Sequence, residues 1–205
     1  MFTGIIAGVG QITEVKPLGA SANDGVRVTI QTNGFDMSRV KLGDSIAIQG
    51  ACMTVVEFDQ HHFKVEVSRE SLNKTRGLDA VGEVNLEHAM RLSDTIDGHL
   101  VLGHVDGLGE VVSFEPTGES YTLRIQMPSH LSKYMAYKGS VTINGVSLTV
   151  NRVEDNAQGC VISINLIPHT VSVTTLKHLT AGKLVNVEVD SIARYVERML
   201  QFKNT

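Results

Sequence analysis

A short segment in the first half of the chain carries residues that could bind and react with a small polar molecule. Residues 50–55 read Gly-Ala-Cys-Met-Thr-Val. Side chains alternate across a strand, so Cys52 and Thr54 would point to the same side. A small donor–acceptor pair beside a glycine can hold a flat polar heterocycle, because the glycine lets backbone amides come close. Taken alone, the segment is better explained as a strand with a small buried cysteine.

The same pattern returns in the second half of the chain. Residues 145–150 read Gly-Val-Ser-Leu-Thr-Val and would place Ser147 and Thr149 on one side of a strand. Because the pattern occurs twice in register, we interpret it as a candidate ligand platform in each half.

Other common catalytic motifs are missing from the sequence. It contains no phosphate-binding loop, no Gly-x-Ser-x-Gly elbow and no complete dinucleotide fingerprint. His99 and His104 are five residues apart, which on a strand would point them to opposite faces, so we expect no shared metal ion. An enzyme with this sequence would work mainly by positioning its reactants.

The elements that position these residues are themselves duplicated. Three pairs of segments match in the same order: residues 4–12 with 103–111, residues 45–55 with 140–150, and residues 82–87 with 182–188. Matches in one order at a nearly constant offset indicate an internal repeat.

Each half is predicted to be a β-barrel, which makes the protein all-β. Apolar and polar residues alternate in several short segments separated by Gly, Asn and Asp: residues 26–30, 62–67, 121–127 and 162–166. A barrel is favoured over a sandwich because it leaves no open sheet edge. We assign the first barrel to residues 1–97 and the second to residues 98–190, and we expect a short, ordered junction near residues 88–97.

The end of the chain, residues 191–205, is predicted to contain a helix without a counterpart in the first half. Asp190 or Ser191 is the expected N-cap. Apolar residues then follow helical spacing at Ile192, Tyr195, Val196, Met199 and Leu200. This apolar face must pack either on its own barrel or against copies of itself in an oligomer.

The composition is that of an ordinary globular protein. The net charge is −4 and the basic residues are scattered, so neither nucleic acid nor an anionic membrane surface is an expected partner. No stretch is apolar enough for a membrane helix. Cys52 and Cys160 cannot build a disulfide framework, and no signal peptide is recognisable, so we expect a reducing, cytoplasmic location.

Taken in order, the sequence resembles riboflavin synthase of the α-chain type over nearly its whole length. The resemblance rests on eight blocks: residues 1–5, 50–55, 98–107, 138–150, 166–170, 174–176, 185–190 and 193–198. The departures are small. Ala51 and Met53 flank the cysteine where larger or leucine side chains are usual, and Asp97 stands where the family usually has glycine.

The resemblance implies a fold, an assembly and a reaction. Family members have two six-stranded Greek-key barrels and a C-terminal helix, through which three chains form a homotrimer. The first barrel of one chain faces the second barrel of its neighbour, with an active site between them. Two molecules of 6,7-dimethyl-8-ribityllumazine react there without metal or organic cofactor. One gives a four-carbon unit to the other, which yields riboflavin and 5-amino-6-ribitylamino-uracil in the final step of riboflavin biosynthesis. Docking of the trimer into a lumazine synthase capsid is left open.

The resemblance also implies a first-half set of site residues. Backbone groups of residues 4–6 and 66–68 would form hydrogen bonds with the edges of the ring. Cys52 would activate or add to the acceptor ring, because a thiolate is nucleophilic. His104 would relay a proton or serve only as a structural residue. The complete set is Gly4, Ile5, Ile6, Ser45, Cys52, Met53, Thr54, Glu66, Val67, Ser68, Gly103, His104 and Val105.

A second-half set completes the implied site. Ser147 would orient a water for addition to the donor ring. Lys138 would contact the anionic edge or a ribityl hydroxyl, or is a surface lysine. Asp190 would accept from the ribityl chain or a water, or caps the helix. The set is Lys138, Ser147, Leu148, Thr149, Ile167, Pro168, His169, Thr170 and Asp190. The candidate catalytic residues of both halves are Ser45, Cys52, His104, Ser147, Thr149 and Asp190.

Two other functions are compatible with such a fold. The lumazine-carrying antenna proteins of luminous bacteria share it but do not turn the substrate over. A flavin-binding barrel of a reductase would need a nicotinamide-binding domain, for which no residues remain. Retention of Cys52, Thr54, His104 and the Ser147–Thr149 pair favours the enzyme.

Overall fold

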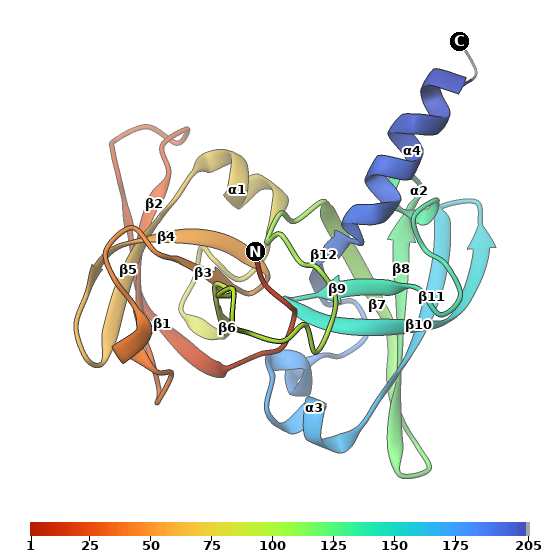
Figure 1. Ribbon diagram of the computed structural model, residues 1–205, viewed down its shortest axis with the longest axis horizontal. Helices are drawn as coiled ribbons and strands as arrows, with labels where there is room; N and C mark the ends of the chain where they lie inside the picture. The colour runs from red at the N-terminus through yellow and green to blue at the C-terminus, as the bar shows by residue number, and fades with distance from the viewer. Residues whose placement is uncertain (204–205) are drawn as a thin grey trace.

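The computed structural model describes residues 1–203, which form two closed antiparallel barrels and a C-terminal helix (Figure 1). The first barrel contains β1 (Gly8–Pro17), β2 (Val26–Gln31), β3 (Ser45–Ile48), β4 (Ala51–Phe58), β5 (His62–Val67) and β6 (Gly82–His88). The second contains β7 (Gly107–Thr117), β8 (Ser120–Pro128), β9 (Ser140–Ile143), β10 (Val146–Asn156), β11 (Gly159–Leu166) and β12 (Leu184–Val189).

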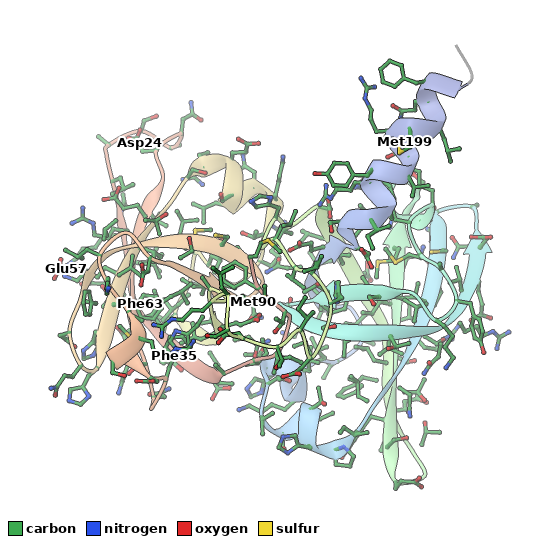
Figure 2. The ribbon with its side chains drawn as sticks, viewed as in Figure 1. Asp24, Phe35, Glu57, Phe63, Met90 and Met199 are labelled. Carbon is green, nitrogen blue, oxygen red and sulfur yellow. The ribbon has the colours of Figure 1, made fainter. Side chains whose placement is uncertain are left out.

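The two barrels have the same topology. Neighbouring strands follow the order β1-β2-β5-β4-β3-β6 in the first and β7-β8-β11-β10-β9-β12 in the second. The prediction of two similar six-stranded barrels is confirmed. Alternating apolar residues fill each interior: Phe63 of β5 lies inside the first barrel (Figure 2), and Ile162 of the equivalent strand β11 is fully buried in the second core.

Short helices close the barrels or connect their strands. They are η1 (Met37–Arg39), α1 (Arg69–Lys74), α2 (Ser129–Ser132), α3 (Pro168–Ser172) and η2 (Thr175–His178). The remaining helix is α4 (Ser191–Lys203). None of the helices within residues 1–203 has the length and apolar character needed to cross a membrane.

The predicted C-terminal helix is confirmed, and it extends beyond the second barrel (Figure 1). Asp190 caps it, since its Oδ1 accepts the N–H of Ile192 at 3.0 Å. The apolar stripe is exposed: Tyr195 is 72% exposed and Met199, labelled in Figure 2, is 73% exposed. The helix therefore leaves most of its apolar face uncovered within one chain.

The barrels meet through two equivalent hairpin turns. Gln49 and Gly50 connect β3 to β4, and Asn144 and Gly145 connect β9 to β10, all with positive φ as in a type I′ turn. A Cβ on Gly50 would lie 2.7 Å from the Gly145 nitrogen, so the close approach requires glycine. Each turn contacts the other in the same way, so an approximate twofold axis relates the two barrels.

Buried asparagines lock these turns together. Asn85 Nδ2 donates to the Asn144 carbonyl, and Asn186 Nδ2 donates to the Gln49 carbonyl, both at 2.9 Å. Polar groups buried in this way stabilise the interface only when their hydrogen bonds are satisfied, as these are.

The junction between the barrels is longer than expected. No helix or strand element lies between His88 and Gly107, although Val101 forms an isolated bridge with Phe2. Phe2 is fully buried and shares a small core with Val101 and Ala47. The start of the chain and the junction thus pair with each other between the barrels. From there the N-terminal segment continues to the second barrel, and the junction continues to the first.

Candidate ligand pockets on the two barrels

The first pocket is built on the outer face of the β3–β4 hairpin. Cys52 is half-buried and Thr54 is exposed, whereas Met53 between them points into the core. Ala47 lies opposite Cys52 and Ser45 opposite Thr54 in the strand register. The structure therefore brings Ser45, Cys52 and Thr54 to one face, as alternation along the strand requires.

A cavity of 230 Å³ opens beside Cys52. One wall is helix α1 and the other is the segment from Gly103 to Val105. Its lining includes neither Ser147 nor Thr149. Ser45 instead borders a different cavity of 370 Å³ with Arg39, His88 and Arg91. The complete lining of the Cys52 cavity is Ala51, Cys52, Met53, Glu70, Ser71, Lys74, Thr75, Gly103, His104 and Val105.

A buried carboxylate of the second barrel fixes one wall of this first pocket. Glu188 accepts the N–H of Leu102 at 2.7 Å and that of His104 at 2.9 Å. Burial raises the pKa of Glu188 to about 7, although the N–H donors act in the opposite direction. The Gly103 carbonyl then accepts the N–H of Cys52 at 2.8 Å, which ties the wall to the platform.

The same arrangement is repeated on the second barrel. Glu87 accepts the N–H of Thr3 at 2.7 Å and that of Gly4 at 3.1 Å, and burial raises its pKa. The Gly4 carbonyl accepts the N–H of Ser147 at 2.8 Å. Glycine is required because a Cβ on Gly4 would lie 2.6 Å from the Ser147 Cβ.

This repetition corrects the grouping of the N-terminal residues. The resemblance implies that Gly4, Ile5 and Ile6 belong to the Cys52 site, but Gly4 contacts Ser147 and Ile6 packs against the core of the second barrel. The physical reason is the crossing of the two segments between the barrels. Sequence matching pairs Gly4 with Gly103 but does not show which barrel each one reaches.

The second platform has an additional group, the imidazole of His99. Its Nδ1 lies 2.7 Å from the Ser147 Oγ, and its Nε2 lies 3.3 Å from the Thr142 Oγ1. Burial lowers the pKa of His99, and the charge of Asp190 partly opposes that shift. No local pattern in the sequence predicts this contact, because His99 reaches Ser147 from the irregular junction between β6 and β7.

Helices α1 and α3 occupy equivalent places beside the two platforms. The Thr75 hydroxyl donates to the Ser71 carbonyl at 2.8 Å, and the Thr174 hydroxyl donates to the Thr170 carbonyl at 2.6 Å. Ser68 caps α1, and Ile167 occupies the N-cap position of α3. Because the two helices are equivalent, the candidate residues 167–170 predict counterparts at residues 68–71. Those counterparts include Glu70 and Ser71, which line the Cys52 cavity.

The other first-half candidates lie on the surface, in the core, at a helix cap or on the cavity wall. Glu66 is exposed and pairs with Arg27 at 2.5 Å, Val67 belongs to the core, and Ser68 accepts the N–H of Ser71. His104 is exposed on the wall of the Cys52 cavity.

The second-half candidates also include buried residues, exposed residues and residues at the starts of helices. Leu148 is buried in the core, Thr149 is exposed opposite Ser140, and Pro168 begins α3 with His169 exposed beside it. Asp190 caps α4 and also borders a groove of 540 Å³ between that helix and the second barrel.

Lys138 adopts a backbone conformation that is unusual for lysine. Its φ is +62°, and its counterpart in the first barrel is Gly43 with φ +85°. The equivalence follows from the backbone, because Lys138 donates to the Val150 carbonyl as Gly43 does to the Val55 carbonyl. A non-glycine residue there costs about 1–2 kcal/mol. Its ammonium reaches the Asn151 side chain at 3.2 Å.

The geometry defines a class of protein: tandem barrels that each present a small ligand platform on the outside of one hairpin. Within residues 1–203 no group of three acidic, histidine or cysteine side chains is placed to hold a metal ion. The two platforms offer backbone amides, hydroxyls and one thiol to a ligand.

Comparisons with known proteins agree with this class. The family described as lumazine binding domain matches twice, over residues 3–89 and 102–190. Riboflavin synthase of Photobacterium leiognathi is 40% identical over 98% of this chain and 89% of its own length. That of Brucella abortus (strain 2308) is 39% identical over 99% and 100%. The crystal structure of LumP complexed with riboflavin has a TM-score of 0.79 at 26% identity, covering 92% of this chain and 99% of LumP. The chain belongs to the riboflavin synthase family of lumazine-binding-domain proteins.

Proposed function

We propose that this protein is a riboflavin synthase, a transferase that converts two molecules of 6,7-dimethyl-8-ribityllumazine into riboflavin and 5-amino-6-ribitylamino-uracil. The observation that carries the proposal is the duplicated platform, with Cys52 and Thr54 on one barrel and Ser147 and Thr149 on the other. Both reactants are the same molecule, so two related platforms can hold them in similar ways.

The main catalytic contribution is the orientation of two flat rings against each other. Such positioning can lower a barrier by about 7–11 kcal/mol through effective molarity. Cys52 supplies the nucleophile or hydrogen-bond donor for the acceptor ring, and Ser147 orients a water at the donor ring. His104, on the wall of the Cys52 cavity, is placed to exchange protons with a bound ring. No metal or organic cofactor takes part.

The active site requires two chains in this proposal. The cavity beside Cys52 is lined by the first barrel and residues 103–105, and the proposal completes it with the Ser147 platform of a neighbouring chain. The exposed apolar stripe of α4 is the surface that would hold three chains together. The free cysteines Cys52 and Cys160 fit the expected reducing, cytoplasmic location.

A second candidate is a protein that binds lumazine or flavin without turnover. It is favoured by the structural likeness to LumP complexed with riboflavin. The thiol of Cys52 beside an open cavity argues for turnover, because a carrier needs no nucleophile there.

One assay separates the two candidates. Purified protein is mixed with 6,7-dimethyl-8-ribityllumazine and no added cofactor, and the products are followed by chromatography. We expect riboflavin and 5-amino-6-ribitylamino-uracil in equal amounts. Tight binding of unchanged lumazine by folded, assembled protein would support the carrier and overturn the enzyme.

A further inference from the structure

The two platforms have the same backbone frame but different side chains around the central residue. Across the strand pair, Cys52 faces Ala47, whose methyl group cannot form a hydrogen bond. Ser147 faces Thr142, which is almost fully buried, and the imidazole of His99 lies against both hydroxyls. The second platform therefore carries a three-membered hydrogen-bonded group at the place where the first has a thiol and a methyl group.

The chain holds His99 firmly in this position. Its backbone N–H donates to the Thr3 carbonyl at 3.1 Å, next to the residues that Glu87 anchors. The preceding Gly98 passes so close that a Cβ there would lie 2.1 Å from the Thr3 oxygen and 2.8 Å from the Ser147 Cβ. An imidazole fixed at both its backbone and its ring can orient a hydroxyl reproducibly.

We infer that His99 is a positioning residue that acts through Ser147: its Nδ1 accepts the Ser147 hydroxyl proton in a hydrogen bond, which leaves the lone pairs of Oγ facing a water at the bound ring. The inference rests on the proposed function, because it requires a ligand on the second platform. No covalent bond forms or breaks at His99. The fixed hydroxyl holds the water in place for its addition to the ring. Without His99 the Ser147 hydroxyl would rotate freely and would not hold the water.

The protonation chemistry of imidazole is consistent with this role. A neutral imidazole has one donor nitrogen and one acceptor nitrogen. If Nδ1 accepts from Ser147, Nε2 carries the proton and donates to the Thr142 hydroxyl, so both ring nitrogens have partners. Burial favours the neutral form that this arrangement requires.

Two isosteric substitutions separate positioning from simple space filling. The amide of asparagine reaches the place of Nδ1, whereas the amide of glutamine reaches the place of Nε2. We expect His99→Asn to keep kcat within about threefold of the wild type, because one hydrogen bond to Ser147 survives. His99→Gln should lower kcat by about tenfold or more at nearly unchanged dissociation constant for the lumazine.

A double-mutant cycle shows whether the effect passes through Ser147. In the Ser147→Ala background, His99→Gln should change kcat by less than about twofold, since the hydroxyl that it orients is gone. Equal activity of the asparagine and glutamine variants, or the same loss in both backgrounds, would overturn the inference. Wild-type protein that forms no riboflavin would overturn the proposed function and this inference with it.

A spectroscopic measurement on the wild type does not depend on the folding of any histidine variant. Nitrogen-15 NMR of the His99 side chain should show a protonated Nε2 and an unprotonated, hydrogen-bonded Nδ1. The Nδ1 signal should move towards that of a free acceptor nitrogen in Ser147→Ala. A proton on Nδ1 of the wild type would contradict the assigned direction of the hydrogen bond.

Discussion

The two platforms share their backbone and differ in their chemistry. Cys52 and Ser147 each donate a backbone N–H, at 2.8 Å in both cases, to the carbonyl of a glycine anchored by a buried glutamate. Beyond that frame, one platform has a thiol beside an open cavity and the other a hydroxyl held by an imidazole. Under the proposed function, the duplicated platforms bind the same kind of molecule, and the side chains that differ between them would have different roles in the reaction.

The largest expected effect comes from removing the thiol that distinguishes the first platform. Cys52→Ser should lower turnover by about 100-fold or more while lumazine binding changes little, because a hydroxyl is a much weaker nucleophile at neutral pH. Steady-state kinetics and equilibrium binding measure the two effects. Cys160→Ala is the matched control, since that thiol lies in the second core. Full activity of Cys52→Ser would remove the chemical difference between the platforms.

Helix α4 has no counterpart in the first half, and its loss tests whether the platforms must come from different chains. A chain that ends before Ser191 should be monomeric and should lose most of its activity. Met199→Glu should disperse the assembly as well, because it places a charge in the exposed apolar stripe. Light scattering after size-exclusion chromatography measures the mass, with Arg198→Gln as the control on the same helix. A fully active trimer without the helix would contradict this account.

The buried carboxylate that holds the first pocket predicts a specific pH dependence. The pKa of Glu188 is raised from 4.5 to about 7, so the folded protein holds this proton more tightly than the unfolded chain. Its contribution to stability is complete below pH 4.5 and is lost as the pH rises through 7, by about 3 kcal/mol.

Urea unfolding between pH 4 and 8 measures this contribution, with sampling on both sides of the window of about 4.5 to 7. The free energy of unfolding of the wild type, minus that of Glu188→Gln, should decrease as the pH rises through that window. The control is Glu119→Gln, which changes an exposed glutamate. A difference that stays constant with pH would show that the carboxyl ionises alike in the folded and unfolded protein.

The smallest effect concerns the lysine that stands where the first barrel has glycine. Lys138→Gly should leave the free energy of unfolding unchanged or raise it by about 1 kcal/mol, because the left-handed backbone no longer strains a side chain. It should also weaken lumazine binding if the ammonium contacts the ligand. The reverse change, Gly43→Lys, should cost about 1 kcal/mol without touching the second platform. Unaltered binding by Lys138→Gly would leave Lys138 a surface residue.

Much of the fold could be predicted because the signals are periodic. Alternation identified strands such as residues 62–67, and helical spacing identified α4. The repeat also placed Cys52 and Ser147 at equivalent positions. The carboxylates Glu87 and Glu188 lie inside the third matched pair of segments, and each follows an asparagine by two residues, so the repeated Asn-x-Glu pattern was a signal for them.

The remaining features depend on how distant segments cross, which local patterns do not encode. The contact of Gly4 with Ser147 follows from the pairing of Phe2 with Val101 between the barrels. The approach of His99 to Ser147 depends on the same crossing. Both are tertiary contacts of irregular segments, so neither periodicity nor the repeat could have indicated them.

The most direct test of the central claim uses two strongly impaired variants together. Cys52→Ser and Ser147→Ala are each purified, mixed, dissociated and reassembled, and riboflavin formation is measured. If each active site joins the first barrel of one chain to the second barrel of another, random mixing restores both intact platforms in about a quarter of the sites. We predict that activity returns to roughly that fraction of the wild-type rate. A mixture no more active than its two components, despite confirmed exchange of chains, would contradict the shared site.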